Sequence, residues 1–237
     1  MLSKLQIKTV RSLRQKKYRQ KSGFFIAEGQ KIVFDLINKG FKVHWLFGTE
    51  EISGFPIHKI SNSEMTKISN FKSPSKVLGV FYLPCSTEMK IQNIDIVLER
   101  IQDPGNMGTI IRLCDWFGFD QIICSNDSVD YFNPKVIQSS MGSFSNISCH
   151  YRNLSEYLSA EKRPIFGTAT QGASLWEFSF PNSFILLFGN ESLGIGKDFA
   201  TLVKQNIRIS KFQTDRPIDS LNIASALGIF LFKIRNQ

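Results

Sequence analysis

The chain has 237 residues, a formal net charge of +9 and 42% hydrophobic residues, with phenylalanine at 21 positions. This composition provides enough apolar side chains for a packed core and excludes a disordered chain, a collagen-like repeat and a small disulfide-stapled domain. The longest apolar runs, residues 183–188 and 224–232, fall well short of the ~20 residues that a membrane-spanning helix needs, so we expect a soluble protein with no membrane partner.

The cysteines are scattered along the chain. Cys85, Cys114, Cys124 and Cys149 form no CxxC pair, and a zinc site or a disulfide framework would need closer or paired spacings. We therefore expect no metal, reduced thiols and a cytoplasmic location.

The positive charge is concentrated at the amino terminus. Eight of the 29 basic residues and none of the 20 acidic residues fall within the first 22 positions. A transit peptide is one alternative, but the segment is rich in lysine and runs without a small-residue cleavage site into residues 23–29, which are typical of a strand and turn. A solvated helix face is another. We favour nucleic-acid contact, because phosphate binding requires a dense, unopposed positive field. The candidate contacts are Lys4, Arg11, Arg14, Lys16, Lys17 and Arg19.

The first 83 residues alternate between predicted helices and strands. We expect a basic helix or helix pair over about 3–21, strands at 24–27, 43–47, 57–60 and 77–83, and helices over about 30–38 and from Ser61 or Ser63. This alternation predicts a compact α/β domain over residues 1–83. The polar stretch 84–92 is the predicted linker.

Residues 93–237 form the second predicted domain. The expected strands are 94–99, 121–124, 164–167, 184–188 and 207–210, and the expected helices are about 107–117, one from 134, 197–203 and 220–234. Strands that alternate with helices of this length favour a parallel sheet with helices on both faces. Ligands of such sheets bind beyond the carboxyl ends of the strands, so the strand-to-helix loops are the places to search for chemistry.

Two of these loops follow strongly apolar strands. Residues 102–112 begin with a Pro-Gly turn whose glycines would let backbone amides approach a ligand at a helix N-terminus, and Arg112 lies one helical turn beyond Gly108. A plain capped turn with a solvent-exposed arginine is an equal alternative. Residues 186–195 bring Gly189 and Glu191 to the exit of the next strand, without the spacing of a phosphate-binding loop.

The third loop joins the strand at 207–210 to the last helix. One alternative is that Ser220 or Asp219 simply caps that helix. Asn222 is harder to explain as a cap, and we interpret it as a polar group directed into a site.

In this order and spacing, the three loops resemble the motifs of the SpoU (TrmH-like) RNA ribose 2′-O-methyltransferases, a family of the SPOUT superfamily. Residues 103–112 match the first motif, 188–195 the second, and 207–210 with 220–226 the third. Residues 133–135 and 139–143 resemble the family's Asn-Pro-Lys and Ala-Ser-x-Gly segments. The basic N-terminal region resembles the small substrate-binding domain that precedes many members, so the resemblance spans nearly the whole chain.

The resemblance implies both a fold and a reaction. The fold is α/β, with a C-terminal parallel-sheet domain that contains a deep trefoil knot, preceded by a small α/β ribosomal-protein-L30e-like substrate-binding domain. The reaction is the transfer of a methyl group from S-adenosylmethionine to a ribose 2′-OH of ribosomal or transfer RNA. The family binds its cofactor largely through backbone atoms of the second and third motif loops, and works as a homodimer that builds the site from both chains.

The resemblance also assigns individual residues. The expected catalytic residues are Asn106, Arg112, Glu191, Ser220 and Asn222. The expected cofactor-binding residues are Thr168, Ala169, Gly189, Ile209 and Leu221. The motifs depart from the family pattern at Ser192, where glycine is common, and at residues 209–211, where Ile-Ser-Lys replaces Ile-Pro-Met. Contacts made through the backbone would tolerate both changes.

Two other functions compete with this one. A non-catalytic RNA-binding or ribosome-assembly factor on a methyltransferase scaffold is disfavoured by the intact polar residues of the three motifs. A nucleotide-dependent Rossmann oxidoreductase is disfavoured because no GxGxxG follows the first strand.

Overall fold

The computed structural model describes the chain except residues 86–87 and 213–219, and divides it into two compact units. The first unit comprises residues 1–87 and 130–145, and the second comprises residues 88–129 and 146–237. Segment 130–145 therefore packs within the first unit, although it lies in sequence between two strands of the second. The predicted domain boundaries at residues 83 and 93 stay a prediction.

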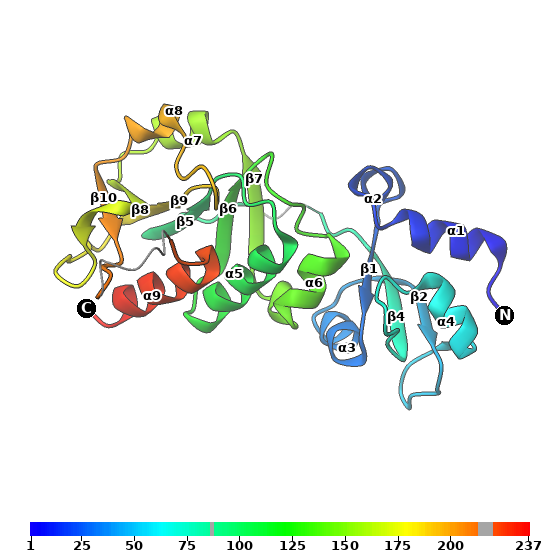
Figure 1. Cartoon of the computed structure of the whole chain (residues 1–237). Helices are drawn as coiled ribbons and strands as arrows, with labels where there is room; N and C mark the ends of the chain where they lie inside the picture. The colour runs from blue at the N-terminus through cyan, green and yellow to red at the C-terminus, as the bar shows by residue number, and fades with distance from the viewer. Residues whose placement is uncertain (86–87, 213–219) are drawn as a thin grey trace. The chain divides into compact units, whose positions relative to one another are not determined.

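A mixed sheet in the order β1-β4-β2-β3 forms the centre of the first unit (Figure 1). Its strands are β1 (Phe24–Glu28), β2 (Val43–Gly48), β3 (His58–Lys59) and β4 (Val77–Tyr82). Strand β4 runs antiparallel to β1 and β2, while β3 runs parallel to β2. The predicted α/β organisation of this region is confirmed.

The helices of the first unit are α1 (Lys4–Ser12), α2 (Lys16–Ser22), α3 (Gln30–Asn38), α4 (Asn62–Ile68), α6 (Pro134–Ser140) and the 3₁₀ helix η1 (Ser143–Ser145). The basic region is thus a pair of helices, as one of the two alternatives predicted. Ser61 caps α4 in a capping box with Glu64. A hydrogen bond from the backbone N–H of Ser61, and a second from that of Leu2, hold the pKa of Glu64 at about 2.

Alternating side chains give this sheet two apolar faces. On one face Ile26 belongs to a cluster with Val10 of α1 and Met65 of α4. On the other face Phe25 contacts four further rings. It stacks on Phe81, meets Phe41 edge to face, and is tilted against Phe132 and Phe144. Segment 130–145 therefore completes the core of the first unit.

The second unit contains a sheet in the order β10-β8-β9-β5-β6-β7, in which every neighbouring pair is parallel. Its strands are β5 (Ile94–Leu98), β6 (Gln121–Ser125), β7 (Ser148–Arg152), β8 (Ile165–Ser174), β9 (Phe184–Phe188) and β10 (Gln205–Arg208). The predicted parallel sheet is confirmed. Strand β7 and the helix that follows it were not predicted, and the trefoil knot stays a prediction.

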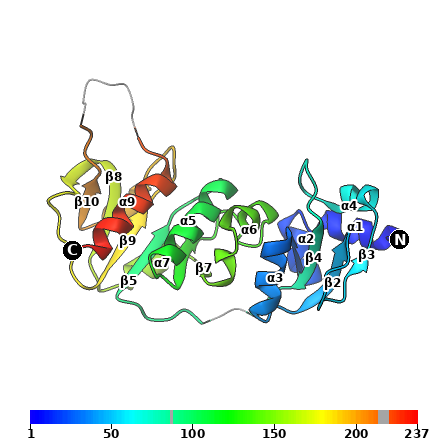
Figure 2. The same ribbon diagram turned by 90° about the horizontal axis from the view of Figure 1, so that it is seen from below.

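Helices cover both faces of this sheet. They are α5 (Pro104–Trp116), α7 (Leu154–Ser159), α8 (Lys197–Ala200) and α9 (Ile223–Arg235). Helices α5 and α9 lie side by side on one face, where Phe188 meets Phe230 edge to face (Figures 1 and 2). On the other face the neighbouring residue Leu187 packs with Leu158 of α7. No helix among the described residues has the length and apolarity to cross a membrane.

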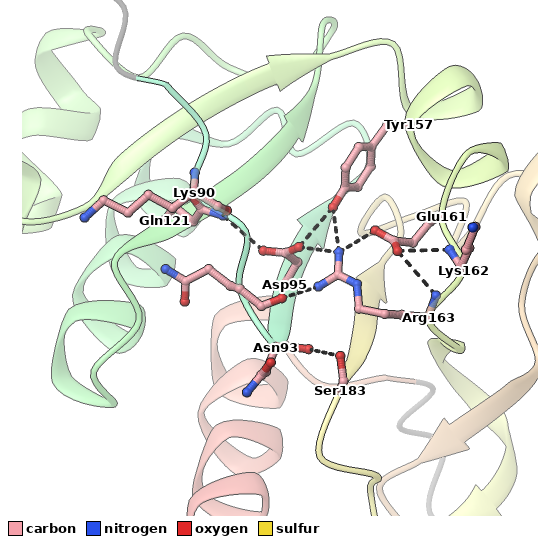
Figure 3. A network of polar contacts seen from close by, with 10 residues as sticks. Lys90, Asn93, Asp95, Gln121, Tyr157, Glu161, Lys162, Arg163 and Ser183 are labelled. Atoms are coloured by element: carbon pink, nitrogen blue, oxygen red, sulfur yellow. Dashed lines mark hydrogen bonds and ion pairs between the residues drawn. The ribbon is translucent and has the colours of Figure 1, made fainter.

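A polar network closes the amino ends of the strands (Figure 3). Asp95, 3% exposed, accepts hydrogen bonds from Arg163 (2.6 Å), Tyr157 (3.0 Å) and Gln121 (3.1 Å). Arg163 also pairs with Glu161, whose hydrogen bond raises the pKa of the guanidinium. The pKa of Tyr157 is raised mainly by burial and secondly by the negative charge of Asp95, so its hydroxyl stays protonated and donates. The three donors, of which Tyr157 and Arg163 are partly exposed, surround and satisfy the buried carboxylate of Asp95.

Candidate active site at the carboxyl ends of the strands

The turn after β5 is a capped helix start. The side chain of Asp103 accepts a hydrogen bond from the backbone N–H of Asn106 (2.7 Å), and Pro104 occupies the first turn, where its missing N–H costs nothing. The alternative of a capped turn is therefore correct as local structure. The turn also positions Asn106, whose side chain points away from the start of the helix towards Glu191.

The loop after β9 is closed on itself. Asn190 and Gly194 exchange two backbone hydrogen bonds of 3.0 and 2.9 Å, and the side-chain oxygen of Asn190 accepts from the N–H groups of Ser192 and Leu193. A Cβ at Gly189 would lie 2.2 Å from backbone atoms of the returning chain, so only glycine fits there. The closure leaves Glu191 exposed at the tip.

A chain of side-chain hydrogen bonds joins the three loops. Asn222 Nδ2 donates to Asn106 Oδ1 (2.9 Å), and Asn106 Nδ2 donates to Glu191 Oε1 (3.1 Å). An ionised carboxylate only accepts, so Asn106 must present its NH₂ group to Glu191 and its oxygen to Asn222. The orientation of each amide is thus determined by its neighbour.

Asn222, the last member of this series of hydrogen bonds, also lies at the start of helix α9. Its side-chain oxygen accepts from the N–H groups of Ala224 and Ser225, so Asn222 is the N-cap of α9. Asn222, which the sequence made hard to explain as a cap, is the cap, so that interpretation is corrected. The alternative in which Ser220 caps the helix is wrong, and Asp219 lies outside the described residues. One side chain both caps and reaches into the site, since an amide carries an acceptor and a donor group on opposite sides.

Two of the expected catalytic residues stand apart from this chain. Ser220 is exposed. Arg112 is exposed as well, and no hydrogen bond or ion pair joins it to another residue in the described part of the protein. It lies six positions after Asn106 on α5, which at ~100° per residue places the two side chains about 120° apart around the helix axis.

Comparisons with known proteins place the chain in a family. The family model of the SpoU rRNA Methylase family matches residues 93–232, and that of the MRM3-like substrate binding domain matches residues 4–79. The chain belongs to the SpoU rRNA methylase family. The predicted family and fold class are thereby confirmed.

Individual relatives cover this SpoU chain almost end to end. The 23S rRNA (guanosine(2553)-2′-O)-methyltransferase RlmP of Bacillus subtilis is 30% identical, and the match covers 97% of this chain and 95% of the relative. A TrmH-family protein from Porphyromonas gingivalis has a structure with TM-score 0.86 and 31% identity, covering 100% and 99% of the two chains. The structure of the AdoMet-bound rRNA methyltransferase from Sinorhizobium meliloti has a TM-score of 0.85 and 28% sequence identity, and the match covers 100% of this chain and 96% of that one.

The cofactor residues expected from the SpoU motifs surround the same strand ends. Gly189 is buried directly after β9, and Thr168 Oγ1 donates to the carbonyl oxygen of Leu187 one strand away (3.3 Å). Ile209 follows β10 and is half-buried, while Leu221 is 49% exposed beside Asn222. Apolar surface next to a few oriented polar groups suits a ligand that carries both a nucleoside and an amino acid, so these residues fit S-adenosylmethionine.

The departure from the third SpoU motif has a local explanation. Ser210 stands where proline is usual, and its hydroxyl lies 3.1 Å from that of Ser174 at the end of β8. This contact ties the third loop to the neighbouring strand. Lys211 is exposed.

Sequence reasoning did not predict the hydrogen bonds that join the second SpoU motif to Glu99 and Arg100. Asn190 Nδ2 donates to the carbonyl oxygen of Arg100 (2.9 Å), and the backbone N–H of Gly196 donates to Glu99 (2.8 Å). The signal available in the sequence was Glu99, an acidic residue directly after the apolar strand β5. Within the described ranges, no group of three or more His, Cys, Asp and Glu side chains is arranged to hold a metal ion.

The first unit corrects one expected RNA contact. Arg19 is 2% exposed, forms an ion pair with Asp130, and donates to the carbonyl oxygens of Leu13 (2.8 Å) and Arg14 (3.0 Å). Its charge therefore holds α2 against segment 130–145 and does not face solvent. Nothing in the local sequence separates Arg19 from its basic neighbours, because its partner lies 111 residues away.

The other N-terminal cations are exposed. Arg11 Nε donates to the carbonyl oxygen of Lys67 (2.7 Å), and Arg14 donates to that of Ser69 (2.5 Å), so both satisfy carbonyl groups at the end of α4. A guanidinium has five N–H donors, and these two keep donors available to solvent. Three further expected contacts are exposed, namely Lys4, Lys16 and Lys17.

Proposed function

We propose that this chain is an S-adenosylmethionine-dependent RNA 2′-O-methyltransferase whose substrate is ribosomal RNA. The methyltransferase activity and the cofactor are supported by family membership and by the AdoMet-bound relative. The choice of ribosomal over transfer RNA follows two relatives that match almost the whole chain, the 23S rRNA methyltransferase of Bacillus subtilis and the rRNA methyltransferase of Sinorhizobium meliloti. The observation that carries the proposal is the hydrogen-bonded chain of Asn222, Asn106 and Glu191, which joins all three motif loops at the carboxyl ends of the strands.

In methyl transfer to a hydroxyl, the main contribution of the protein is to position the two reactants. S-adenosylmethionine supplies an electrophilic methyl group on a sulfonium, so the chain must align a ribose 2′-oxygen with it and stabilise the charge that develops on that oxygen. Asn106, held between two partners, is a fixed polar group for this purpose. Arg112 would hold the target phosphate and stabilise the alkoxide, since a guanidinium does not act as a base at neutral pH. The hydroxyl proton would pass to water or to a neighbouring group, and the sulfonium would leave as a neutral thioether.

We further propose a homodimer that completes the site. Arg112 is turned away from Asn106 on the same helix, and the surface beside it is apolar: Trp116 is 85% exposed one turn further along α5, and Phe232 on the adjoining α9 is 61% exposed. A second copy seated on this face would cover both rings. It would also bring its own Arg112 towards the site of the first chain.

The N-terminal helices would grip RNA through its phosphates. Contacts of this kind position the strand without reading its sequence. We expect Lys16→Ala with Lys17→Ala to weaken binding of a ribosomal RNA fragment and to flatten its salt dependence, with unchanged S-adenosylmethionine affinity. Unchanged RNA affinity would remove these lysines from the interface.

A cytoplasmic location is part of the proposal. All four cysteines are free, and burial raises the pKa of the Cys114 thiol, which stays protonated and unreactive. Reduced thiols are typical of the cytoplasm.

The decisive experiment separates an enzyme from a binding factor. We expect S-adenosylmethionine to stabilise the protein in a thermal-shift assay, and methyl groups to be incorporated into ribosomal RNA from a strain that lacks this gene. A 2′-deoxy substitution at the mapped nucleotide should abolish incorporation. We expect Arg112→Ala to lose transfer by at least about 10³-fold while still binding cofactor in calorimetry. RNA binding without cofactor binding would instead support the non-catalytic alternative.

A further inference from the structure

Two residues directly after β5 lie outside every motif. Glu99 is 3% exposed, and Arg100 has a φ of +52°, in the left-handed region that residues with a Cβ rarely occupy. Such a conformation persists where surrounding contacts hold it, and it occurs preferentially at functional sites. Here the contacts lead to the loop over residues 190–196.

Both ends of that loop are fastened to these two residues. At its start, Asn190 Nδ2 donates to the carbonyl oxygen of Arg100 (2.9 Å). At its end, the backbone N–H of Gly196 donates to Glu99 Oε2 (2.8 Å). The backbone N–H of Glu99 in turn donates to the carbonyl oxygen of Phe188, the last residue of β9 (2.8 Å). The loop that carries Glu191 is therefore held at two points by consecutive residues of another strand exit.

The guanidinium of Arg100 makes this arrangement possible. It lies 2.7 Å from Glu99 Oε1, which leaves Oε2 for Gly196. Without it, a carboxylate would be buried with only one neutral donor, an arrangement that is strongly unfavourable. The backbone N–H of Arg100 donates to Ser125 Oγ (2.8 Å), which anchors the left-handed turn to β6.

We propose that Glu99 and Arg100 are positioning residues for cofactor binding, which hold the loop over residues 190–196 in the shape that S-adenosylmethionine requires. This inference rests on the proposed function, since that loop carries the second SpoU motif. The two residues touch the loop and act on the ligand through it. Their removal should weaken the binding of cofactor more than it slows the chemical step.

The sharpest variant is Arg100→Gly. Glycine adopts the left-handed backbone without steric cost and keeps the carbonyl group that holds Asn190, so only the guanidinium is lost. We expect calorimetry to give a Kd for S-adenosylmethionine about tenfold higher. The KM should rise by a similar factor, with kcat at saturation within about twofold of the wild type. Arg100→Lys keeps a cation near Glu99 and should restore affinity to within about threefold.

Lys197→Ala is the matched control. It removes one exposed positive charge from the residue that follows the loop, and its Kd should equal that of the wild type. Wild-type affinity in Arg100→Gly would overturn the inference, as would an equal loss in Lys197→Ala, which would indicate a general charge effect. Failure of the wild-type protein to bind S-adenosylmethionine would instead contradict the proposed function.

A second variant guards against misfolding of Arg100→Gly. Glu99→Gln keeps an acceptor for Gly196 and leaves no buried charge without a partner, so the protein should fold. We expect its Kd to rise in the same direction by about threefold, because the ion pair that orients the acceptor is gone. Unchanged affinity in this variant would also overturn the inference.

Discussion

The two ends of the parallel sheet in the second unit carry polar networks of different character. At the amino ends, Asp95 is 3% exposed and both of its oxygens accept hydrogen bonds from other side chains (Figure 3). At the carboxyl ends, Asn222 and Glu191 are exposed and Asn106 is half-buried. One network is built around a buried carboxylate, and the other is open to solvent.

The difference shows what each network can do. A buried, saturated network has no capacity left for a ligand, and its removal leaves a buried charge without a partner. An exposed amide that uses only some of its donors and acceptors keeps the others for a ligand. We therefore expect substitutions at the amino ends to change stability, and substitutions at the carboxyl ends to change the reaction.

Arg163→Met should have the largest effect on stability. Asp95 would keep Tyr157 and Gln121 but lose its cation, so we expect the free energy of unfolding in urea to fall by about 3–5 kcal/mol. The kcat of the folded protein should stay within about twofold. Arg152→Met, which removes an exposed arginine from the end of β7, is the control and should change stability by less than about 0.5 kcal/mol. A large loss of kcat in Arg163→Met would break the division between the two ends.

Asn106→Ala should have the opposite signature. We expect kcat in single-turnover assays to fall by about 10²–10³-fold, as when a fixed polar group is removed from an active site, with little change in the thermal midpoint. Thr109→Ala removes an exposed hydroxyl one turn along the same helix and should keep kcat within about twofold. Full activity in Asn106→Ala would show that the hydrogen bonds joining Asn222, Asn106 and Glu191 are only structural.

Asn222→Asp separates the two roles of one side chain. Aspartate keeps an acceptor for the N–H groups of Ala224 and Ser225, and its charge favours the start of a helix, so stability should be unchanged or slightly higher. It replaces the donor to Asn106 by an acceptor, so methyl transfer should fall by about tenfold. Asn222→Ala, which loses both roles, should in addition cost about 1 kcal/mol of stability. Equal activity in the wild type and Asn222→Asp would contradict this assignment.

The smallest effect should be a pH dependence at the amino ends of the strands, where Glu161 is partly exposed. A hydrogen bond from Arg163 holds the pKa of Glu161 below its ordinary value of 4.5. The stabilisation is therefore complete above pH 4.5 and is lost as the pH falls towards the lowered pKa of the folded protein. We expect the stability difference between the wild type and Glu161→Gln, about 1 kcal/mol or less at pH 6, to shrink between pH 4.5 and pH 3. A difference that grows on acidification would be inconsistent with this ion pair.

The elements with clear local signals were predicted well. Strand β9 is a short, wholly apolar run, and helix α3 is an amphipathic segment that precedes Gly40, and the structure places both at the predicted bounds. The motif loops were found because turn and cap residues act over a few positions. The resemblance of these loops to the SpoU motifs, and not local propensity, predicted Asn106, Glu191 and Asn222 as site residues.

The elements that were missed depend on distant partners. Strand β7 contains polar and aromatic residues and is a strand because it pairs with β6, with His150 opposite Ile123. Strand β8 runs on past its apolar start because β10 pairs with it a second time, at Ala173 and Ser174. Arg19 looks like any cation of a basic helix until Asp130 folds against it. Propensity and periodicity carry no information on such pairings.

By itself, the sequence determined the α/β class of each domain and the candidate loops, because apolar periodicity and turn residues act over short spans of chain, and the order and spacing of the three motifs determined the family by resemblance. Only the tertiary structure decided which of those residues meet. It joined Asn222, Asn106 and Glu191 from loops as many as 116 positions apart, buried one of the expected RNA contacts, and attached the loop over residues 190–196 to Glu99 and Arg100. Those outcomes depend on which strand exits lie side by side, and the order of strands in a sheet is set by packing across the whole domain.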